Sequence, residues 1–327
     1  MRRLAVVPVR GCRRGRGLEL LLGNLRKAME FRGLNGKILD TDELILVEAD
    51  RPIEASKSLA KLSGVEYAGT VEVSSKEEGE FLSVAKRVAR ALAWRGKCMS
   101  VRMEGEEEPS RLEDLKFLTE VELVGVLSDL GMKVRDEGEV VLRVFVGKKA
   151  GYFFYHTSPG FGGYPTGYRG RALVLLAGER GLKSALLAIR AGFEVELATV
   201  EPRAREAIRM ASELSDHYPE GLRLFVVRAI GCDPVDALFD FACERAGEGP
   251  IPIPDSLGFE SLSSFEERGV PILFMTLHLT EEEAGRWGEV APRGGCGHEV
   301  LELYVGRGRE NECFNELERF RARAPRI

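Results

Sequence analysis

Residues 158–170, Ser158-Pro-Gly-Phe-Gly-Gly-Tyr-Pro-Thr-Gly-Tyr-Arg-Gly170, separate two regions with different hydrophobic patterns. Their density of Gly and Pro is typical of a connection between domains, and we predict a linker over residues 158–171. Downstream, apolar runs typical of buried strands alternate with helical stretches. These runs are residues 172–177, 194–200, 223–227, 250–254 and 272–277. The alternation predicts an α/β domain over residues 172–327 with a doubly wound parallel sheet, whose ligand would lie at the carboxyl ends of the strands.

The region before the linker contains two shorter patterns of strands and helices. Residues 1–75 follow the β-α-β-β-α-β order of a ferredoxin-like unit, beginning with an apolar strand and a helix whose leucines share one face. From residue 76 to 157 the pattern restarts with a helix, a strand, a second helix and a hairpin around residues 147–151. The sequence therefore predicts two small domains of mixed α and β structure ahead of the linker.

The order of small residues in the linker resembles that of a known family. Gly160, Gly162, Gly163, Pro165, Gly167, Gly170 and Arg171 match a segment of the form G-x-G-G-x-P-x-G-x-x-G-(R/K). This segment is similar to the one in the 4-thiouridine synthetase (ThiI) family, which acts in tRNA thiolation and in thiamine biosynthesis. The resemblance implies an N-terminal ferredoxin-like domain, a THUMP domain and a C-terminal PP-loop (adenine nucleotide hydrolase-like) domain. A generic Gly-rich linker is the alternative interpretation.

Charge is distributed unevenly along the chain, whose formal net charge is -5. Residues 1–33 contain nine Lys and Arg and two Glu, a balance of +7, which leaves the remainder at -12. Such a basic end is either a patch for phosphates or an ordinary solvated loop. The family resemblance favours tRNA, because RNA helices are recognised through phosphates and shape. The candidate RNA-binding residues are Arg10, Arg13, Arg14, Arg16, Arg102, Lys148 and Lys149.

The predicted nucleotide loop departs from the family pattern. Where the family has S-G-G-x-D-S after the first strand of the PP-loop domain, this chain reads Ala177-Gly-Glu-Arg-Gly-Leu-Lys-Ser184. The resemblance implies a nucleotide site made of Gly178, Glu179, Arg180, Gly181, Lys183 and Ser184. A carboxylate beside a phosphate is unfavourable by about 4 kcal/mol at 4 Å if the effective dielectric constant is near 20. We therefore expect a degenerate site, with ATP and magnesium as cofactors only if the site is active.

A different nucleotide-binding motif, G-x-x-x-x-G-K-(S/T), fits the same stretch poorly, because the spacing is wrong and Leu182 precedes Lys183. The expected function is thus that of a tRNA-binding ThiI-like protein in tRNA modification. The alternative is an active ATP-dependent tRNA uracil 4-sulfurtransferase with a divergent nucleotide loop. Its catalytic thiol would be Cys296, which Gly297 follows as in some family members, and whose pKa His298 could lower if the two side chains were close.

Composition sets the remaining expectations. The six cysteines form no C-x-x-C pair and no Cys/His cluster, so we expect no metal site. The absence of Gln and the abundance of Glu and Arg are typical of thermophile proteins. No apolar stretch reaches the roughly 20 residues that a membrane span needs, and we expect a cytoplasmic protein. The expected partners are tRNA, a sulfur-donor protein and a second copy of the chain.

Overall fold

The computed structural model describes residues 2–39, 44–176, 179–253 and 297–323. The chain divides into two compact units. The first unit comprises residues 1–8, 34–60 and 66–160, and the second comprises residues 9–33, 61–65 and 161–327. The chain therefore passes between the units several times. The domain limits expected from the sequence remain a prediction.

The first unit is built on one eight-stranded sheet with the strand order β2-β3-β1-β4-β8-β7-β5-β6. Its elements are β1 (Arg2–Pro8), β2 (Gly36–Leu39), β3 (Ile45–Ala49), α2 (Pro52–Ala60), β4 (Val65–Ser75), α3 (Glu78–Leu92), β5 (Cys98–Gly105), α4 (Pro109–Ser128), β6 (Lys133–Val134), β7 (Val140–Val146) and β8 (Ala150–Pro159). With α1 (Gly15–Phe31) between β1 and β2, the predicted β-α-β-β-α-β order is confirmed. The predicted restart after β4, with two helices and a hairpin, is confirmed as well.

Strand β4 joins the two halves of this sheet, which the sequence did not predict. It pairs with β8 in antiparallel register from Tyr67↔Pro159 to Ser75↔Ala150. Gly69 lies in the middle of β4, where a Cβ atom would come within 1.9 Å of the carbonyl oxygen of His156. Only glycine permits so close an approach of the two strands. The apolar cluster around Tyr67 and Phe154 also includes residues from both halves of the sheet.

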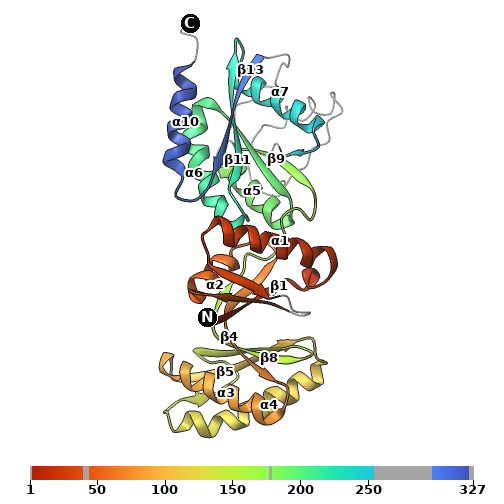
Figure 1. Cartoon of the computed structure of the whole chain (residues 1–327), viewed down its shortest axis with the longest axis vertical. Coiled ribbons are helices and arrows are strands. Elements are labelled where there is room, and N and C mark those ends of the chain that lie inside the picture. Colours follow the sequence, from red (N-terminus) through yellow and green to blue (C-terminus); the bar gives the residue numbers. More distant parts are fainter. Residues whose placement is uncertain (1, 40–43, 177–178, 254–296, 324–327) are drawn as a thin grey trace. The chain divides into compact units, whose positions relative to one another are not determined.

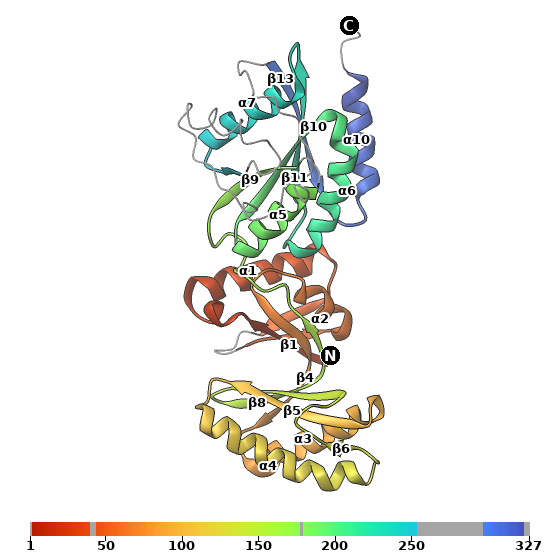
Figure 2. The same cartoon turned by 180° about the vertical axis from the view of Figure 1, so that it is seen from behind.

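The second unit contains a five-stranded sheet with helices on both faces (Figure 1, Figure 2). Its strands are β9 (Arg171–Leu175), β10 (Glu194–Val200), β11 (Leu222–Ile230), β12 (Ile251–Ile253) and β13 (Gly297–Val305), in the order β12-β9-β10-β11-β13. Helices α5 (Glu179–Ala191), α6 (Ala204–Leu214) and α10 (Glu310–Ala322) cover one face, and α7 (Pro234–Gly247) covers the other.

The parallel, doubly wound arrangement predicted for this unit is confirmed for β12, β9, β10 and β11. Strand β13 is an exception, since it pairs with β11 in antiparallel register. The predicted strand 272–277 lies outside the described residues. The chain runs from β9 through β10 to β11 and then returns to the other side of β9, so the strand order reverses between β9 and β12. Open α/β sheets bind their ligands at such a switch point.

The glycines of the predicted linker hold a compact turn against the end of α5. Gly163 has a φ of 74°, and a Cβ atom there would lie 1.9 Å from the carbonyl oxygen of Arg190. The backbone N–H of Tyr164, the next residue, donates to that oxygen at 2.9 Å. Gly162 also has a positive φ, and its carbonyl oxygen accepts a hydrogen bond from Gly64. The pattern of small residues thus has a local structural cause.

Helix α1 is bonded to distant parts of the second unit. The side-chain amide of Asn24 donates to the carbonyl oxygen of Thr166 at 3.1 Å. The ammonium group of Lys27 lies 2.9 Å from the carboxylate of Glu220. These contacts explain why α1 clusters with the C-terminal sheet. No helix in the described ranges is long and apolar enough to cross a membrane.

Candidate functional site

The start of α5, which belongs to the predicted nucleotide loop, lies at the switch point of the C-terminal sheet. Strand β9 ends at Leu175, and α5 begins at Glu179. Both backbone polar groups of Leu176 are hydrogen-bonded to β10. Its N–H donates to the carbonyl oxygen of Ala198 at 2.7 Å, and its carbonyl oxygen accepts from the hydroxyl of Thr199 at 2.9 Å. The N-terminus of α5 is therefore held at the carboxyl edge of the sheet, where free backbone N–H groups favour an anion.

Five of the six predicted nucleotide-site residues lie in the first two turns of α5, while Gly178 lies outside the described residues. Glu179 is the first residue of the helix and is exposed. Arg180 and Lys183 are half-buried, and Gly181 is buried. A carboxylate in the first turn stabilises the partial positive charge of a helix N-terminus by about 0.3 to 1 kcal/mol. Glu179 thus supplies from within the chain the negative charge that a bound phosphate would bring.

Ser184 is the fifth of these residues and is fully buried. Its hydroxyl oxygen has no hydrogen-bond partner among the described residues. Burying a hydroxyl without a hydrogen bond costs about 1 to 3 kcal/mol on the scale of protein mutations. The hydroxyl of Ser184 and the ammonium group of Lys183 are consequently two donors that this helix start could offer to a ligand.

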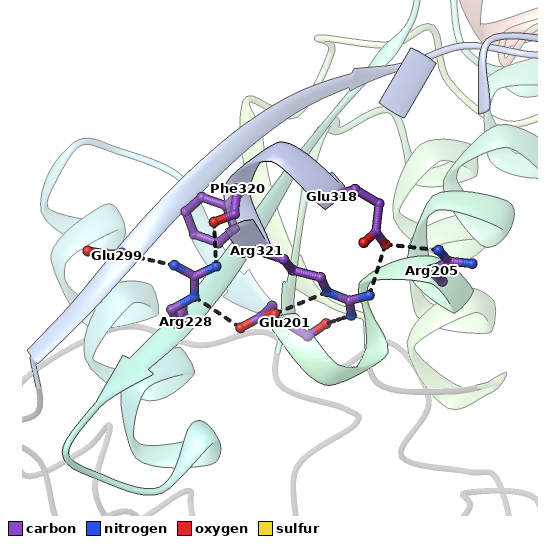
Figure 3. Close-up of polar contacts among 7 residues, drawn as sticks. All are labelled: Glu201, Arg205, Arg228, Glu299, Glu318, Phe320 and Arg321. Carbon is purple, nitrogen blue, oxygen red and sulfur yellow. Dashed lines mark hydrogen bonds and ion pairs between the residues drawn. The ribbon is translucent and has the colours of Figure 1, made fainter. Parts of the chain in front are cut away.

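A network of ion pairs occupies the carboxyl edge over β10 and β11 (Figure 3). Its centre is Arg228 on β11, which donates to Glu201 at 3.0 Å, to Glu299 at 2.9 Å and to the carbonyl oxygen of Phe320 at 2.8 Å. The guanidinium carbon also lies 3.8 Å from the centre of the Phe320 ring. Arg321 of α10 donates to the other carboxylate oxygen of Glu201 at 3.1 Å.

These contacts fix helix α10 to the sheet and use the donors of Arg228. Only 11% of the Arg228 side chain is exposed, so it is not available to an incoming phosphate. Further out, Glu318 accepts from both Arg205 and Arg321. No sequence pattern indicated this network, because its members come from two strands, a 3-10 helix and two α-helices, with partners up to 120 residues apart.

Arg171, the last residue of the Gly-rich segment, has a structural partner at the opposite, amino end of the sheet. It donates to Glu196 of β10 at 2.7 Å, and Arg245 of α7 donates to both oxygens of the same carboxylate at 2.9 and 3.0 Å. Burial raises the pKa of Glu196, but the hydrogen bonds from Arg245 and Arg171 outweigh it and leave the pKa below its ordinary value. Arg171 therefore acts in this buried cluster, away from the nucleotide loop.

The predicted RNA-binding residues fall into two groups. The first group lies in the second unit: Arg10 is on a short 3-10 helix, Arg13 and Arg14 connect it to α1, and Arg16 is at the start of α1. All four are exposed except Arg13, which is half-buried. The second group lies in the first unit and consists of Arg102 on β5 and Lys148 and Lys149 in the β7–β8 turn, all exposed.

The first unit also contains a cleft that the sequence did not reveal, with a volume of about 810 Å³. Arg3, Arg95, Tyr155 and His156 are among its lining residues. Arg95 donates to the carbonyl oxygen of Tyr155 at 2.9 Å and lies 5.3 Å from the ring centre of Trp94, which is 80% exposed. An exposed Trp beside an Arg is the only local signal that could have indicated this surface.

The charged residues in the lining of this cleft are two arginines, Arg3 and Arg95, and one carboxylate, Glu72. Burial lowers the pKa of His156, and the charges of Lys57 and Arg95 lower it further. Burial and a hydrogen bond to Glu72 raise the pKa of Tyr155 to about 12. At neutral pH the histidine and the tyrosine are therefore uncharged, and Arg3 and Arg95 supply the positive charge of the lining.

The predicted catalytic thiol, Cys296, lies outside the described residues. His298 is described at the start of β13, where its Nε2 atom lies 3.4 Å from the carboxylate of Glu244. Its ring packs edge-on against Phe241, with 6.0 Å between the ring centres. The role of Cys296 and any effect of His298 on its pKa stay predictions.

Comparison with known proteins gives a curated relative and structures of similar fold. No protein-family profile matches the sequence. The probable tRNA sulfurtransferase of Enterococcus faecalis is 24% identical over 228 residues, which are 66% of this chain and 55% of that protein. The chain thus spans about half the length of this curated relative.

Two crystal structures are similar in fold. One is that of PH1313 from Pyrococcus horikoshii, with a TM-score of 0.66 and 18% identity over 87% of this chain and 97% of the other. The second is a 4-thiouridine synthetase in complex with RNA and bound ATP, with a TM-score of 0.60 and 16% identity over 98% and 94% of the two chains. The chain is therefore similar in sequence to a tRNA sulfurtransferase, and similar in fold to PH1313 and to a 4-thiouridine synthetase.

Proposed function

We propose that this chain is a tRNA-binding, ThiI-like protein that acts in tRNA modification and whose nucleotide site is degenerate. The tRNA part is supported by the relatives, one of which is named as a tRNA sulfurtransferase and another as a 4-thiouridine synthetase bound to RNA. The observation that carries the degenerate-site part is the position of Glu179 as the first residue of α5, at the switch point of the sheet.

Glu179 opposes nucleotide binding for two physical reasons. Its carboxylate would lie near the phosphates and repel them, by about 4 kcal/mol at 4 Å in an effective dielectric constant near 20. It also neutralises the helix N-terminus that should attract them. The loop further lacks the family Asp and the final Ser, where this chain has Gly181 and Leu182. Positioned charges of this kind supply much of the catalysis in phosphate chemistry.

RNA binding is supported by the surfaces of both units. The arginines at positions 10 to 16 are mostly exposed, and such groups release counterions when they bind phosphates. In the first unit, the flat, exposed indole of Trp94 lies next to Arg95, which lines the cleft. Bases of single-stranded RNA stack on such side chains with about 1 to 3 kcal/mol each. We propose that unpaired nucleotides bind at this cleft.

A second candidate function is an active, ATP-dependent tRNA 4-thiouridine sulfurtransferase that uses magnesium, a sulfur-donor protein and the thiol of Cys296. The observation that favours it is the buried hydroxyl of Ser184, which lacks a partner among the described residues and lies one residue after Lys183. Together these residues could meet a phosphate in place of the missing loop residues.

The nucleotide site is tested by titrating the full chain with ATP and magnesium in a calorimeter, with and without tRNA, and by assaying pyrophosphate. We expect a dissociation constant weaker than about 1 mM and no pyrophosphate. The Glu179→Gly variant should bind ATP at least tenfold more tightly, because the carboxylate is removed. Glu206→Gly is the matched control, since Glu206 is an exposed residue in the first turn of α6. Micromolar ATP binding by the unchanged chain, with tRNA-dependent pyrophosphate release, would establish the active enzyme instead.

RNA binding is tested by gel-shift titration of tRNA at several salt concentrations. Replacing Arg13, Arg14 and Arg16 with Ala should weaken binding and reduce the salt slope by about 2 to 3, since each phosphate contact contributes about 0.7 to 0.9. The control variant removes the same charge elsewhere, at Arg209, Arg319 and Arg323, which are also exposed. Equal losses in the two variants would mean that only net charge matters. Trp94→Ala should weaken binding at all salt concentrations without changing the slope.

A further inference from the structure

The Gly-rich segment carries two tyrosines whose rings stack on each other. The ring centres of Tyr164 and Tyr168 lie 4.9 Å apart, and the angle between the ring planes is 17°. The backbone N–H of Tyr164 donates to the carbonyl oxygen of Arg190, at the end of α5, at 2.9 Å. Gly192 has a φ of 91°, and a Cβ atom there would lie 2.8 Å from the Cβ of Tyr164 and 3.1 Å from that of Tyr168. The end of α5 therefore holds the tyrosine pair in place.

Each ring of this pair also has a guanidinium group over it. The guanidinium carbon of Arg169 lies 5.5 Å from the ring centre of Tyr164. That of Arg16, on α1, lies 6.0 Å from the ring centre of Tyr168. Aromatic rings attract cations that lie within about 6 Å of the ring centre. The rings therefore restrain two arginines that are both exposed.

A third guanidinium group, that of Arg190, lies next to the tyrosine pair. Its side chain passes over the turn that precedes Tyr164, since a Cβ atom at Gly162 would lie 3.7 Å from a terminal nitrogen of Arg190. Arg190 is exposed as well. We call Arg16, Tyr164, Tyr168, Arg169 and Arg190 the tyrosine platform. All five residues belong to the second unit.

The groups that the tyrosine platform offers to a ligand are hydrogen-bond donors. Within the described ranges, its three guanidinium groups form no ion pair and its two hydroxyls form no hydrogen bond. A guanidinium group that lies over a ring keeps the N–H groups at its edge free. Such charged N–H groups form short, strong hydrogen bonds to phosphate oxygens, often two at a time. The chemistry of the platform therefore fits a ligand with several phosphates.

Two carboxylates limit where such a ligand can lie. Glu19 and Glu194 line a cleft of about 630 Å³, and Arg16 lines the same cleft. Carboxylates repel phosphates, so a phosphate is unfavourable there. The described lining of this cleft does not include Arg169 or Arg190. We therefore expect the ligand at these two arginines, with Arg16 at its border.

We propose that the tyrosine platform binds the sugar–phosphate backbone of a double-stranded stem of tRNA, an inference that rests on the proposed tRNA binding. The rings are occupied by each other and by guanidinium groups, so the platform offers N–H groups in place of open ring faces. A duplex presents its phosphates at fixed positions, and restrained donors can bind them without ordering the ligand first. RNA helices are recognised mostly through phosphates, 2′-hydroxyls and shape. The platform thus differs from the cleft near Trp94, for which we propose unpaired nucleotides.

The test is a gel-shift titration of the full chain with a blunt-ended RNA duplex and a single-stranded RNA of equal length, at several salt concentrations. Replacing Arg169 and Arg190 together with Ala should weaken duplex binding about tenfold, because two charge-assisted contacts are lost. The salt slope for the duplex should fall by about 2, since each phosphate contact contributes about 0.9. Binding of the single strand should change by at most about twofold. The matched control replaces Arg209 and Arg319 with Ala, because both are exposed residues of the same unit.

A second variant, Arg169→Lys with Arg190→Lys, separates the platform from net charge. Lysine keeps the charge but lacks the planar fork, so the salt slope should stay the same while duplex binding weakens about threefold. The proposal is overturned, and the proposed tRNA binding stands, if the lysine variant binds the duplex as tightly as the unchanged chain. The same holds if the platform and control variants lose equal affinity, or if the chain binds tRNA but not the duplex. A chain that binds neither tRNA nor the duplex would refute both.

Discussion

Replacing Glu196 with Gln tests the buried charge cluster at the amino end of the C-terminal sheet. Glu196 is 3% exposed and accepts hydrogen bonds from Arg171 and, at both oxygens, from Arg245. A third guanidinium, that of Arg223, lies 3.5 Å away. Glutamine keeps the size of the side chain but removes the charge, and its amide N–H₂ would face a guanidinium that also only donates.

The loss of unfolding free energy in Glu196→Gln depends on how well water can solvate the arginines once the carboxylate is removed. Removing one partner of a buried ion pair costs about 3 to 5 kcal/mol. The side chains of Arg171 and Arg223 are 34% and 48% exposed, so water can solvate them after the change, whereas that of Arg245 is only 16% exposed. Because water screens the two more exposed arginines, we expect a loss below that range, about 2 to 3 kcal/mol of unfolding free energy.

The same cluster predicts a dependence on pH. The pKa of Glu196 is below its ordinary value, since the bonds from Arg245 and Arg171 outweigh the effect of burial. Its stabilising contribution is fully present above the unfolded-state pKa of about 4.3 and is lost as the pH falls through the lower folded-state pKa. The difference in stability between the unchanged chain and Glu196→Gln should therefore shrink in acid.

Hydrogen exchange followed by mass spectrometry can measure this effect in the second unit alone. At neutral pH, peptides from β9 and β10 should exchange faster in Glu196→Gln, and peptides from β7 should not change. Glu302→Gln is the control, because Glu302 is 55% exposed and lies 3.7 Å from the exposed Arg223; it should cost less than about 1 kcal/mol. Equal effects of the two variants, or a Glu196→Gln deficit that does not shrink as the pH falls below about 4.3, would refute the reasoning.

The remaining predictions concern the linker, the ion network and a buried thiol. Gly163→Ala should lower the melting temperature more than Gly167→Ala, since both sites have positive φ but only at Gly163 would the new Cβ meet a backbone oxygen, at 1.9 Å. Arg228→Lys should speed hydrogen exchange in α10, because the lysine cannot make the three bonds of the guanidinium, and Arg205→Lys, on an exposed pair, should not. Burial raises the pKa of Cys313, so its alkylation at pH 8 should stay slow until denaturant is added, and fast native labelling would contradict this.

Local patterns in the sequence were enough to predict most elements of the fold. The β-α-β-β-α-β order, the two helices that follow it and the parallel strands of the second unit each have a clear hydrophobic period. The pairing of β4 with β8 could not be predicted in this way, because it joins strands about 80 residues apart. Strand β13 was not among the predicted strands, because its glutamates, Glu299 and Glu302, are three residues apart and break the period of two.

The start of the helix after β9 was predictable from the sequence, and α5 does begin there, at Glu179, while the nucleotide site itself stays a prediction. The burial of Ser184 and the closure of the neighbouring edge by Arg228 depend on which elements meet in three dimensions. The cleft near Trp94 likewise forms from separate strands and a helix end, so no single stretch of sequence encodes it.

The partition of the chain between its two units has a consequence for synthesis on the ribosome. Helix α1 leaves the ribosome early, yet its bond partners Thr166 and Glu220 lie 142 and 193 residues from Asn24 and Lys27. At about 5 to 20 residues per second, the ribosome needs about 10 to 40 s to make the 193 residues that separate Lys27 from Glu220. During this interval the nascent chain contains α1 but lacks the residue that bonds to Lys27 in the finished protein.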